Sequence, residues 1–300
     1  MKNITITGAT GFVGKNLLSY LKGVDIRAIT RAELSDINDD LLKRSDTVIH
    51  LAGKAHDLKK ALNPQEYYDV NFELTKKLFD AFIKSDAKKF IFLSSVKAAA
   101  DSVNGILTED IVPEPKTDYG KSKLMAEQFI QGVRLPQGKS YYILRPCMIH
   151  GPGNKGNLNL LYKFVKKGIP YPLAGFDNKR SFLSVQNLCF VINELIGRDD
   201  IASSIYQVAD DEPLSTNEVV NALSASINKK PKLWKIPPQL IHAAAKFGDA
   251  LNLALTTERL NKLTESYIVS NQKIKTAIGK ALPLTSRKGL EVTAESFSGQ

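Results

Sequence analysis

The sequence predicts an α/β fold, namely a doubly wound parallel sheet with a second, smaller α+β lobe. Short β-branched runs alternate with longer amphipathic runs through the first half of the chain, and this alternation is typical of parallel sheets with crossover helices. A glycine triplet, GATGFVG at residues 8–14, joins the first two of these runs. The alternation weakens after His150, where Gly151-Pro152-Gly153 forms a turn cluster.

Apolar periodicity places the elements of the first half. Strands are predicted at 4–7, 25–30, 47–50, 90–94 and 141–144, and helices at 12–21, 66–85 and 119–133. The segments 182–185 and 206–208 are expected to return to the sheet. We therefore expect one domain over 1–150 with a returning segment 180–207, and a second lobe over 151–179 and 208–300.

Composition limits the class of protein. The 300 residues are 43% hydrophobic and 24% charged, with a net charge of +10. The lysines lie in scattered pairs without interleaved aromatic residues, which favours solvated faces and an anionic small substrate over a nucleic-acid or membrane-surface site. The start resembles no signal peptide, and the longest apolar stretch, 240–255, is interrupted by polar residues. Cys147 and Cys189 show no metal-ligand spacing. We expect a cytoplasmic protein without membrane insertion, nucleic acid or metal.

The glycine triplet predicts a dinucleotide site. Gly8, Gly11 and Gly14 follow a predicted strand and open a predicted helix. Small residues there let the backbone approach a pyrophosphate, and the helix N-terminus offers amide donors. This context predicts a Rossmann unit that binds NAD or NADP.

The second predicted strand ends at Thr30-Arg31 and carries no acidic residue there. An acid at this place usually binds the ribose hydroxyls of NAD, whereas Arg31 can pair with the 2′-phosphate of NADP. The alternative is that Arg31 only caps the strand in solvent. We favour NADP over NAD on this ground.

A tyrosine and a lysine four residues apart indicate proton transfer. Tyr119 and Lys123 lie on one face of a predicted helix. A nearby ammonium is expected to lower the pKa of the phenol toward working pH. The strand at 90–94 delivers Ser94 and Ser95 to its carboxyl end, where a hydroxyl can bind the reacting oxygen. Alone, the tyrosine and lysine could be an exposed pair on a helix, and the serines could cap the end of a strand. Their order along the chain favours an active site.

Together these residues resemble the extended short-chain dehydrogenase/reductase family, in its branch of nucleotide-sugar epimerases, dehydratases and reductases. The resemblance covers nearly the whole chain. Its motifs, in order, are Gly8–Gly14, Asp36-Ile37, His50–Gly53, Asn71, Ser94-Ser95, Tyr119–Lys123, Arg145-Pro146, Gly151–Gly153 and Arg180–Val185.

The resemblance implies a role for each matching position. Ser95, Tyr119 and Lys123 would be catalytic, and Ser95, Asn157 and Arg180 would bind substrate, the last two at its diphosphate. The implied cofactor contacts are Gly8, Gly11, Phe12, Val13, Gly14, Asp36, Ile37, Ala52, Gly53, Asn71, Tyr119 and Lys123, to which the residue argument adds Arg31.

Two departures from the family pattern narrow the reaction. Val96-Lys97 stands where the 4,6-dehydratases of the family carry an Asp-Glu pair, which argues against elimination of water. His150 stands in place of a tyrosine before the Gly-Pro-Gly turn, and we expect it to pack rather than catalyse. His50 is expected to be structural.

The specific hypothesis is reduction of a UDP-4-keto-6-deoxy-N-acetylhexosamine at C4 by NADPH, in surface polysaccharide biosynthesis. The alternative is a UDP-hexose or UDP-N-acetylhexosamine 4-epimerase with tightly held NAD. An alternative of another class is a non-catalytic dinucleotide-binding sensor, which retention of Ser95, Tyr119 and Lys123 disfavours. A UDP-sugar is the expected partner, and the resemblance implies a homodimer.

Overall fold

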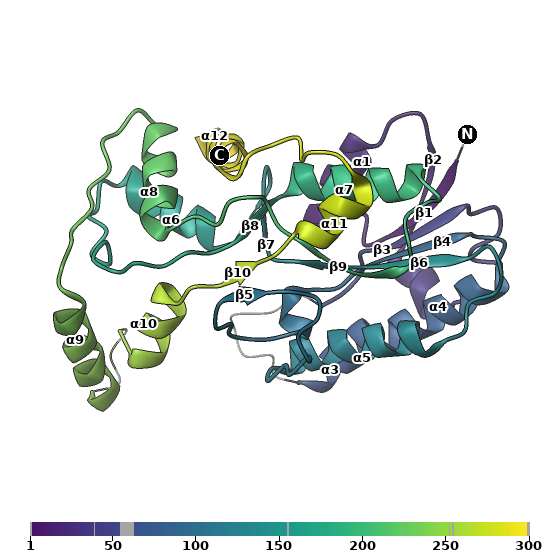
Figure 1. Cartoon of the computed structure of the whole chain (residues 1–300), viewed down its shortest axis with the longest axis horizontal. Coiled ribbons are helices and arrows are strands. Elements are labelled where there is room, and N and C mark those ends of the chain that lie inside the picture. Colours follow the sequence, from purple (N-terminus) through teal and green to yellow (C-terminus); the bar gives the residue numbers. More distant parts are fainter. Residues whose placement is uncertain are drawn as a thin grey trace.

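The computed structural model describes residues 2–38, 40–54, 63–154, 156–251, 253 and 255–298. Its centre is a six-stranded parallel sheet with helices on both faces (Figure 1). The strands are β1 (Asn3–Thr7), β2 (Asp25–Ile29), β3 (Thr47–His50), β4 (Lys89–Leu93), β6 (Ser140–Pro146) and β9 (Ser204–Val208). The predicted fold class is confirmed.

The strand order β2-β1-β3-β4-β6-β9 contains one reversal. From β1 the chain moves first to β2 on one side and then to β3 on the other side. In open sheets of this kind, ligands bind outside the carboxyl ends of the strands at the point of reversal. This topology directs attention to the loops that follow β1 and β3.

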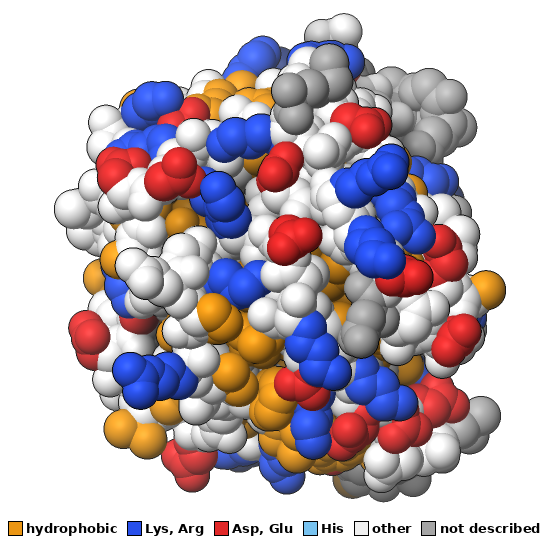
Figure 2. Space-filling model, turned by 90° about the vertical axis from the view of Figure 1, so that its right-hand side faces the viewer, with side chains coloured by type: hydrophobic (Ala, Val, Ile, Leu, Met, Phe, Trp, Pro, Cys, Tyr) orange, Lys and Arg blue, Asp and Glu red, His pale blue; other side chains and the backbone are white. Residues whose placement is uncertain are grey.

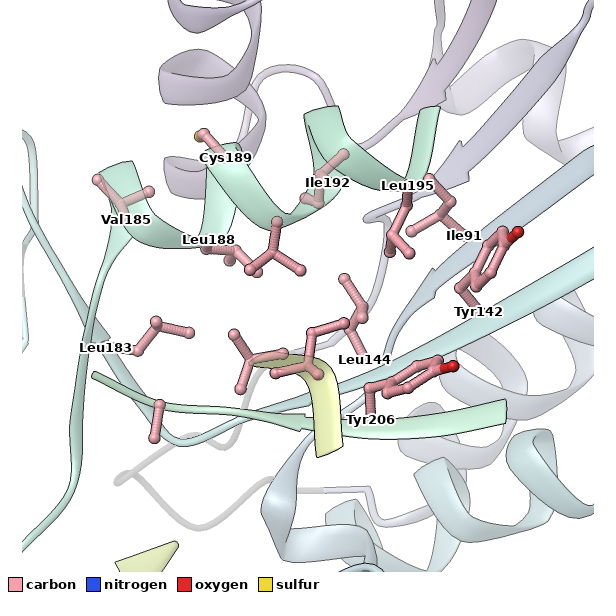
Figure 3. Packing of buried hydrophobic residues seen from close by; sticks show 14 of the residues in the cluster. Ile91, Tyr142, Leu144, Leu183, Val185, Leu188, Cys189, Ile192, Leu195 and Tyr206 are labelled. Atoms are coloured by element: carbon pink, nitrogen blue, oxygen red, sulfur yellow. The ribbon is translucent and has the colours of Figure 1, made fainter. Parts of the chain in front are cut away.

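One face of the sheet is covered by α1 (Phe12–Tyr20), α7 (Val185–Gly197) and α11 (Gln272–Ile278). Figure 3 shows Leu188 and Leu195 of α7 directed toward the sheet, where Ile91 and Leu144 lie. These side chains are fully buried. Removing such apolar surface from water is the main stabilising term of the fold.

The opposite face is covered by α2 (Arg31–Ser35), α4 (Leu74–Lys84) and α5 (Asp118–Gly132). Phe79 and Phe82 of α4 meet Phe90 of β4 at ring-centroid distances of 5.0 and 5.3 Å. Neighbouring residues of β4 serve different faces, since Phe90 joins this cluster and Ile91 joins the one beneath α7. This alternation follows from the two-residue period of a strand.

The helix predicted over 66–85 is a continuous helical run with a wide turn inside it. It comprises α3 (Gln65–Tyr68), a π-helical turn η1 (Asp69–Glu73) and α4. Asn71 lies in the π turn and is fully buried. Such turns are frequent at functional sites, and this one lies beside the loop after β3.

A smaller lobe lies at one end of the sheet (Figure 1). Its helices are α6 (Asn157–Lys166), α8 (Thr216–Ala225), α9 (Pro238–Ala250), α10 (Thr257–Thr264) and α12 (Ser286–Ser298). Two short sheets, β5 (Ile106–Leu107) with β10 (Ile268–Val269) and β7 (Met148–His150) with β8 (Phe182–Ser184), join it to the larger body, since Leu107, Leu183 and Val269 are buried in the cluster on the main sheet. No helix in the described part of the chain is both long enough and apolar enough to cross a membrane.

The returning segments behave differently from each other. The segment 206–208 joins the main sheet within β9. The segment 182–185 does not, because β9 already occupies the open edge of β6 and β8 pairs with β7 instead. Ile274 and Ile278 of α11 are buried in the cluster on the sheet, so the C-terminal part of the chain also returns to the larger body. The boundaries 1–150 with 180–207 and 151–179 with 208–300 stay a proposal.

Candidate active site

The loop between β1 and α1 fits a dinucleotide. Gly8 has φ +72°, and a Cβ there would lie 2.6 Å from the backbone nitrogen of Ala52. Gly11 is the N-cap of α1, and neither a side-chain cap nor an acidic residue occupies the first turn. The first amides of α1 therefore lack a side-chain acceptor at the point where the strand order reverses. This is the arrangement that binds a pyrophosphate.

The other residues of the loop support its backbone. Gly14 is buried, and the side chains of Phe12 and Val13 pack against the cluster beneath α1. The positions predicted for the cofactor thus divide into backbone donors at the helix N-terminus and packing residues behind them.

Asn71 holds the loop after β3. Its Oδ1 accepts from the Lys54 amide at 2.8 Å, and its Nδ2 donates to the Lys54 carbonyl at 3.1 Å and to the Ser122 hydroxyl at 3.1 Å. A Cβ on Gly53 would lie 3.1 Å from Lys123 Nζ. Ala52 and Gly53 therefore lie between the glycine loop and Lys123.

His50 is structural, as predicted. It is fully buried, and its ring nitrogens lie 2.7 Å from Thr7 Oγ1 and 2.9 Å from Thr75 Oγ1. Burial lowers the pKa of His50 to about 3, so the ring is neutral and connects β1, β3 and α4.

The end of β2 carries both a cation and an acid. Arg31 is exposed at the start of α2, and Asp36 and Ile37 follow at its end. Glu33 folds back in a capping box, in which its carboxylate accepts from the amide and the hydroxyl of Thr30 at 2.8 Å each. This acid was not predicted, although the spacing Thr30-x-x-Glu33 indicates a capping box.

Ser95 and Tyr119 meet at the carboxyl end of β4. Ser95 is the N-cap of η2 (Val96–Ala98), where its hydroxyl accepts from the Lys97 amide at 3.2 Å. The same hydroxyl lies close enough to the Tyr119 phenol to act on the pKa of that phenol. Gly120 permits this approach of α5, because a Cβ there would lie 2.4 Å from the Lys97 carbonyl oxygen. Tyr67 packs edge-on against the Tyr119 ring at 6.1 Å.

Lys123 lies one helical turn behind Tyr119 and is buried. Its Nζ donates to the Leu93 carbonyl at 2.9 Å and lies 4.8 Å from the centroid of the Phe92 ring. Burial lowers the pKa of Lys123 to about 8, and the carboxylate of Glu127 partly opposes that shift. The structure thus brings all three predicted catalytic residues together at the carboxyl end of β4.

The prediction about the phenol is wrong in one respect. We expected the ammonium of Lys123 to lower the pKa of Tyr119, but burial raises that pKa, and the hydrogen bond from Ser95 opposes the rise only in part. Removal from water disfavours the phenolate. Lys123 directs its charge to the Leu93 carbonyl instead.

Turnover is expected to fall as the pH rises through about 8, the value to which burial lowers the pKa of Lys123. Below that pH the side chain is charged and above it neutral, so an activity that needs the ammonium is present at low pH and lost at high pH. Initial rates at saturating substrate across this range measure the effect. A flat profile through pH 8, with the chain still folded by circular dichroism, would contradict it.

A buried ion pair lies behind the three catalytic candidates. Glu127 and Arg145 are both fully buried, and Arg145 Nη2 lies 2.5 Å from a Glu127 oxygen. Ser94 also donates to the Glu127 carboxylate. Sequence reasoning singled out Arg145 only as part of a motif and missed Glu127, although Tyr119, Lys123 and Glu127 recur at four-residue spacing.

The predicted substrate cation Arg180 is held by the end of α10. Its Nε donates to the Glu265 carbonyl at 3.0 Å, and Nη2 donates to the Lys262 carbonyl. Lys97, which sequence reasoning used only against dehydration, is electrostatically coupled to Arg180. Its Nζ donates to the Asp101 carbonyl at 2.7 Å. The side chain of Asn157 lies outside the described residues.

Three other predicted positions are structural. His150 is buried, and its Nδ1 lies 2.8 Å from Thr293 Oγ1, so it packs as predicted. Cys147 and Cys189 are buried, and burial raises the pKa of each thiol. Within the described ranges, no three side chains of His, Cys, Asp or Glu gather in a way that could hold a metal ion.

Comparisons with known proteins agree with this geometry. Residues 4–209 match the model of the NAD dependent epimerase/dehydratase family. The chain is 32% identical to a UDP-glucose 4-epimerase of Vibrio cholerae, over 99% of this chain and 95% of that protein. It is 27% identical to an N-acetyl-alpha-D-glucosaminyl-diphospho-ditrans,octacis-undecaprenol 4-epimerase of Escherichia coli O157:H7, over 98% of this chain and 94% of that protein.

The fold also matches solved structures. The structure of MoeE5 in complex with UDP-glucuronic acid and NAD superposes with a TM-score of 0.77 at 21% identity, covering 99% of each chain. At that identity the likeness concerns the fold alone. The family match and the Vibrio cholerae relative carry the assignment: the chain belongs to the NAD dependent epimerase/dehydratase family and is an NAD(P)-dependent enzyme.

Proposed function

We propose that the chain is a 4-epimerase of a UDP-hexose or UDP-N-acetylhexosamine. The observation that carries the proposal is that Ser95 and Tyr119 lie close together at the carboxyl end of β4, on the side of the sheet that also holds the dinucleotide loop. The relatives in Vibrio cholerae and Escherichia coli, both 4-epimerases that align over nearly the whole chain, support the same reaction.

The proposed roles follow from the positions of the side chains. Tyr119 takes the proton of the C4 hydroxyl as a phenolate and returns it, as a phenol, to the same oxygen after the sugar has turned over. Because burial raises the pKa of this phenol, the phenolate needs positive charge beside it during turnover, and Lys123 lies one helical turn away. Ser95 donates a hydrogen bond to that oxygen, which stabilises the charge that develops there. Lys123 keeps its ammonium within the buried site behind them. NAD bound at the glycine loop supplies the acceptor and donor of hydride.

A diphosphate would lie nearer the smaller lobe. Lys97 and Arg180 are the cations that approach each other there, from η2 and from the segment before β8. Both are partly buried, so their attraction for a phosphate is less screened than at an exposed surface. We propose that they bind the diphosphate of the substrate.

The cofactor tests the proposal. An epimerase should purify with NAD bound and should interconvert UDP-GlcNAc and UDP-GalNAc, or UDP-glucose and UDP-galactose, without added cofactor. Products are followed by NMR, and released cofactor is identified after denaturation. Stoichiometric consumption of NADPH with a 4-keto sugar, and no epimerisation of any of these four sugars, would overturn it.

The second candidate is reduction of a UDP-4-keto-6-deoxy-N-acetylhexosamine by NADPH, and Arg31 is the observation that favours it. Arg31 is exposed at the end of β2, where it can pair with a 2′-phosphate. The carboxylate of Glu33 three residues from Thr30 opposes a phosphate at the same place.

The variant Arg31→Ala tests whether the attraction of Arg31 for the 2′-phosphate outweighs the repulsion by Glu33. If Arg31 selects NADP, the substitution should weaken NADPH binding by about tenfold, which corresponds to the loss of one charge-assisted contact, and leave NADH binding unchanged. Titration of the intrinsic fluorescence with each cofactor measures this. The matched variant Glu33→Gln should raise the affinity for NADPH relative to NADH, because it removes a negative charge near the place of the 2′-phosphate. Equal affinity for both cofactors, unchanged in Arg31→Ala, would remove the NADP preference.

A further inference from the structure

Helix α9 is apolar on two neighbouring faces. Its inner face buries Ile241, Ala245 and Gly248 against the small cluster of α10. Leu240 and Phe247 lie on the other face, where they are 62% and 63% exposed. In a globular protein the face of a surface helix that points to solvent is usually polar. The exposed apolar face of α9 therefore indicates contact with something outside this chain.

The exposed apolar residues around α9 form a concentrated set. Six of the twelve large hydrophobic side chains that are exposed in the described structure lie between residues 234 and 263. They are Trp234, Leu240, Phe247, Leu251, Leu253 and Leu263. We call the described part of the segment 229–263 the α9 surface. Helices α9 and α10 lie side by side at the end of the smaller lobe, away from the main sheet (Figure 1). Apolar sets of this kind mark interaction sites.

The same segment carries half of the net charge of the protein. Residues 229–263 contain seven basic and two acidic residues, a net charge of +5 out of +10. Three of the basic residues, Lys229, Lys230 and Lys232, lie beside Val165 and Val220 of α6 and α8, and the others lie nearer to α9 and α10. The two acids are engaged within the segment, since Asp249 accepts from the Thr257 amide at 3.0 Å and Glu258 pairs with Lys262. Lys235 and Lys246 are exposed, and no ion pair to another described residue is recorded for either.

The opposite end of the molecule differs. Figure 2 views the protein from the end away from α9 and shows basic and acidic side chains mixed over that face.

We propose that the α9 surface docks on an anionic lipid bilayer. An amphipathic helix with Phe and Leu on one face and lysines beside it lies in the plane of the interface, with its apolar stripe in the headgroup boundary and its cations at the lipid phosphates. Trp234 has the amphipathic ring that is enriched at that depth. The attachment is superficial, and it goes beyond the proposed C4 chemistry without altering it. It departs from the expectation that the scattered lysines serve no membrane-surface site, because the structure exposes apolar side chains beside them.

Charge argues against the other occupants. A second copy related by two-fold symmetry would place the same positive surface against itself. Nucleic acid would satisfy the lysines but would leave Leu240 and Phe247 against phosphates and water. A bilayer with anionic lipids satisfies the apolar stripe and the charge together.

The test is co-sedimentation of the full chain with vesicles. Vesicles of phosphatidylcholine mixed with phosphatidylglycerol should bind the chain, pure phosphatidylcholine should bind it much less, and added salt should release it. Leu240→Gln/Phe247→Gln should weaken binding by about tenfold or more. The control is Leu160→Gln on α6, where the side chain is 64% exposed, and it should bind like the parent.

A second pair of variants tests the charge. Lys235→Gln/Lys246→Gln should weaken binding to the anionic vesicles, whereas Lys22→Gln/Lys88→Gln, exposed lysines outside the segment, should not. Vesicle binding is measured without turnover, so its outcome is independent of the proposed reaction. Absence of binding to anionic vesicles would overturn the proposal. Equal effects of the α9 and control variants would do so too, as would a dimer that Phe247→Gln dissociates.

Discussion

The variant Tyr119→Phe is expected to lose turnover by about 10²- to 10⁴-fold, the range that a positioned acid–base group contributes. The substitution removes the hydroxyl group that lies near Ser95 and leaves the ring, which packs against Tyr67. Cofactor affinity should remain within about twofold, because the glycine loop is untouched. Steady-state rates and a fluorescence titration with NADH measure the two quantities.

Tyr206→Phe is the matched control. Its hydroxyl donates to the Ala202 carbonyl at 2.7 Å on β9, away from Ser95. It should keep its turnover, although it loses a hydrogen bond of ordinary strength. If Tyr119→Phe kept parental turnover, proton transfer by Tyr119 would be excluded. A sensor without catalysis would show no turnover in the parent either.

The variant Arg145→Met is expected to lower the free energy of unfolding by about 3–5 kcal/mol, the cost of leaving one member of a buried ion pair alone. Both side chains are essentially inaccessible to water, at 1% and 0% exposure. Of the hydrogen bonds to the Glu127 carboxylate in the described structure, only the one from the Ser94 hydroxyl would then remain. Urea unfolding followed by circular dichroism measures the difference.

Two further variants complete that experiment. Glu258→Ala removes an ion pair to Lys262 whose side chains are 77% and 68% exposed, and it should cost less than about 1 kcal/mol. The double variant Glu127→Met/Arg145→Met should recover part of the loss, because no unpaired charge stays buried. If Arg145→Met lowered the free energy of unfolding by less than about 1 kcal/mol, the prediction would be wrong, because the buried Glu127 carboxylate would then not depend on Arg145.

Local signals predicted the dinucleotide end and the Tyr119 and Lys123 pair. Each depends on a short spacing, such as a glycine loop between a strand and a helix, or two side chains one helical turn apart. The capping box of Thr30 and Glu33 was equally local, and applying the capping rule at that position would have found the acid at the end of β2.

Other parts of the site depend on contacts between distant segments. The coupling of Lys97 with Arg180, and the hold of α10 on Arg180, bring together residues that lie 83 and 85 positions apart. Pairing of β8 with β7 likewise depends on β9 having occupied the edge of β6. Neither the contacts of Arg180 nor the pairing of β7 with β8 produces a periodic pattern that can be recognised in one sequence.

The sequence by itself determined the doubly wound sheet, the dinucleotide loop and the order of Ser95, Tyr119 and Lys123, because periodicity and short spacings dictate local structure. The tertiary structure decided the pKa directions of Tyr119 and Lys123, since desolvation depends on what covers a group. It also decided which apolar face of α9 is covered. The spacing of apolar residues along a helix predicts that one face avoids water. Only the packing shows whether this chain covers that face or leaves it for an external surface.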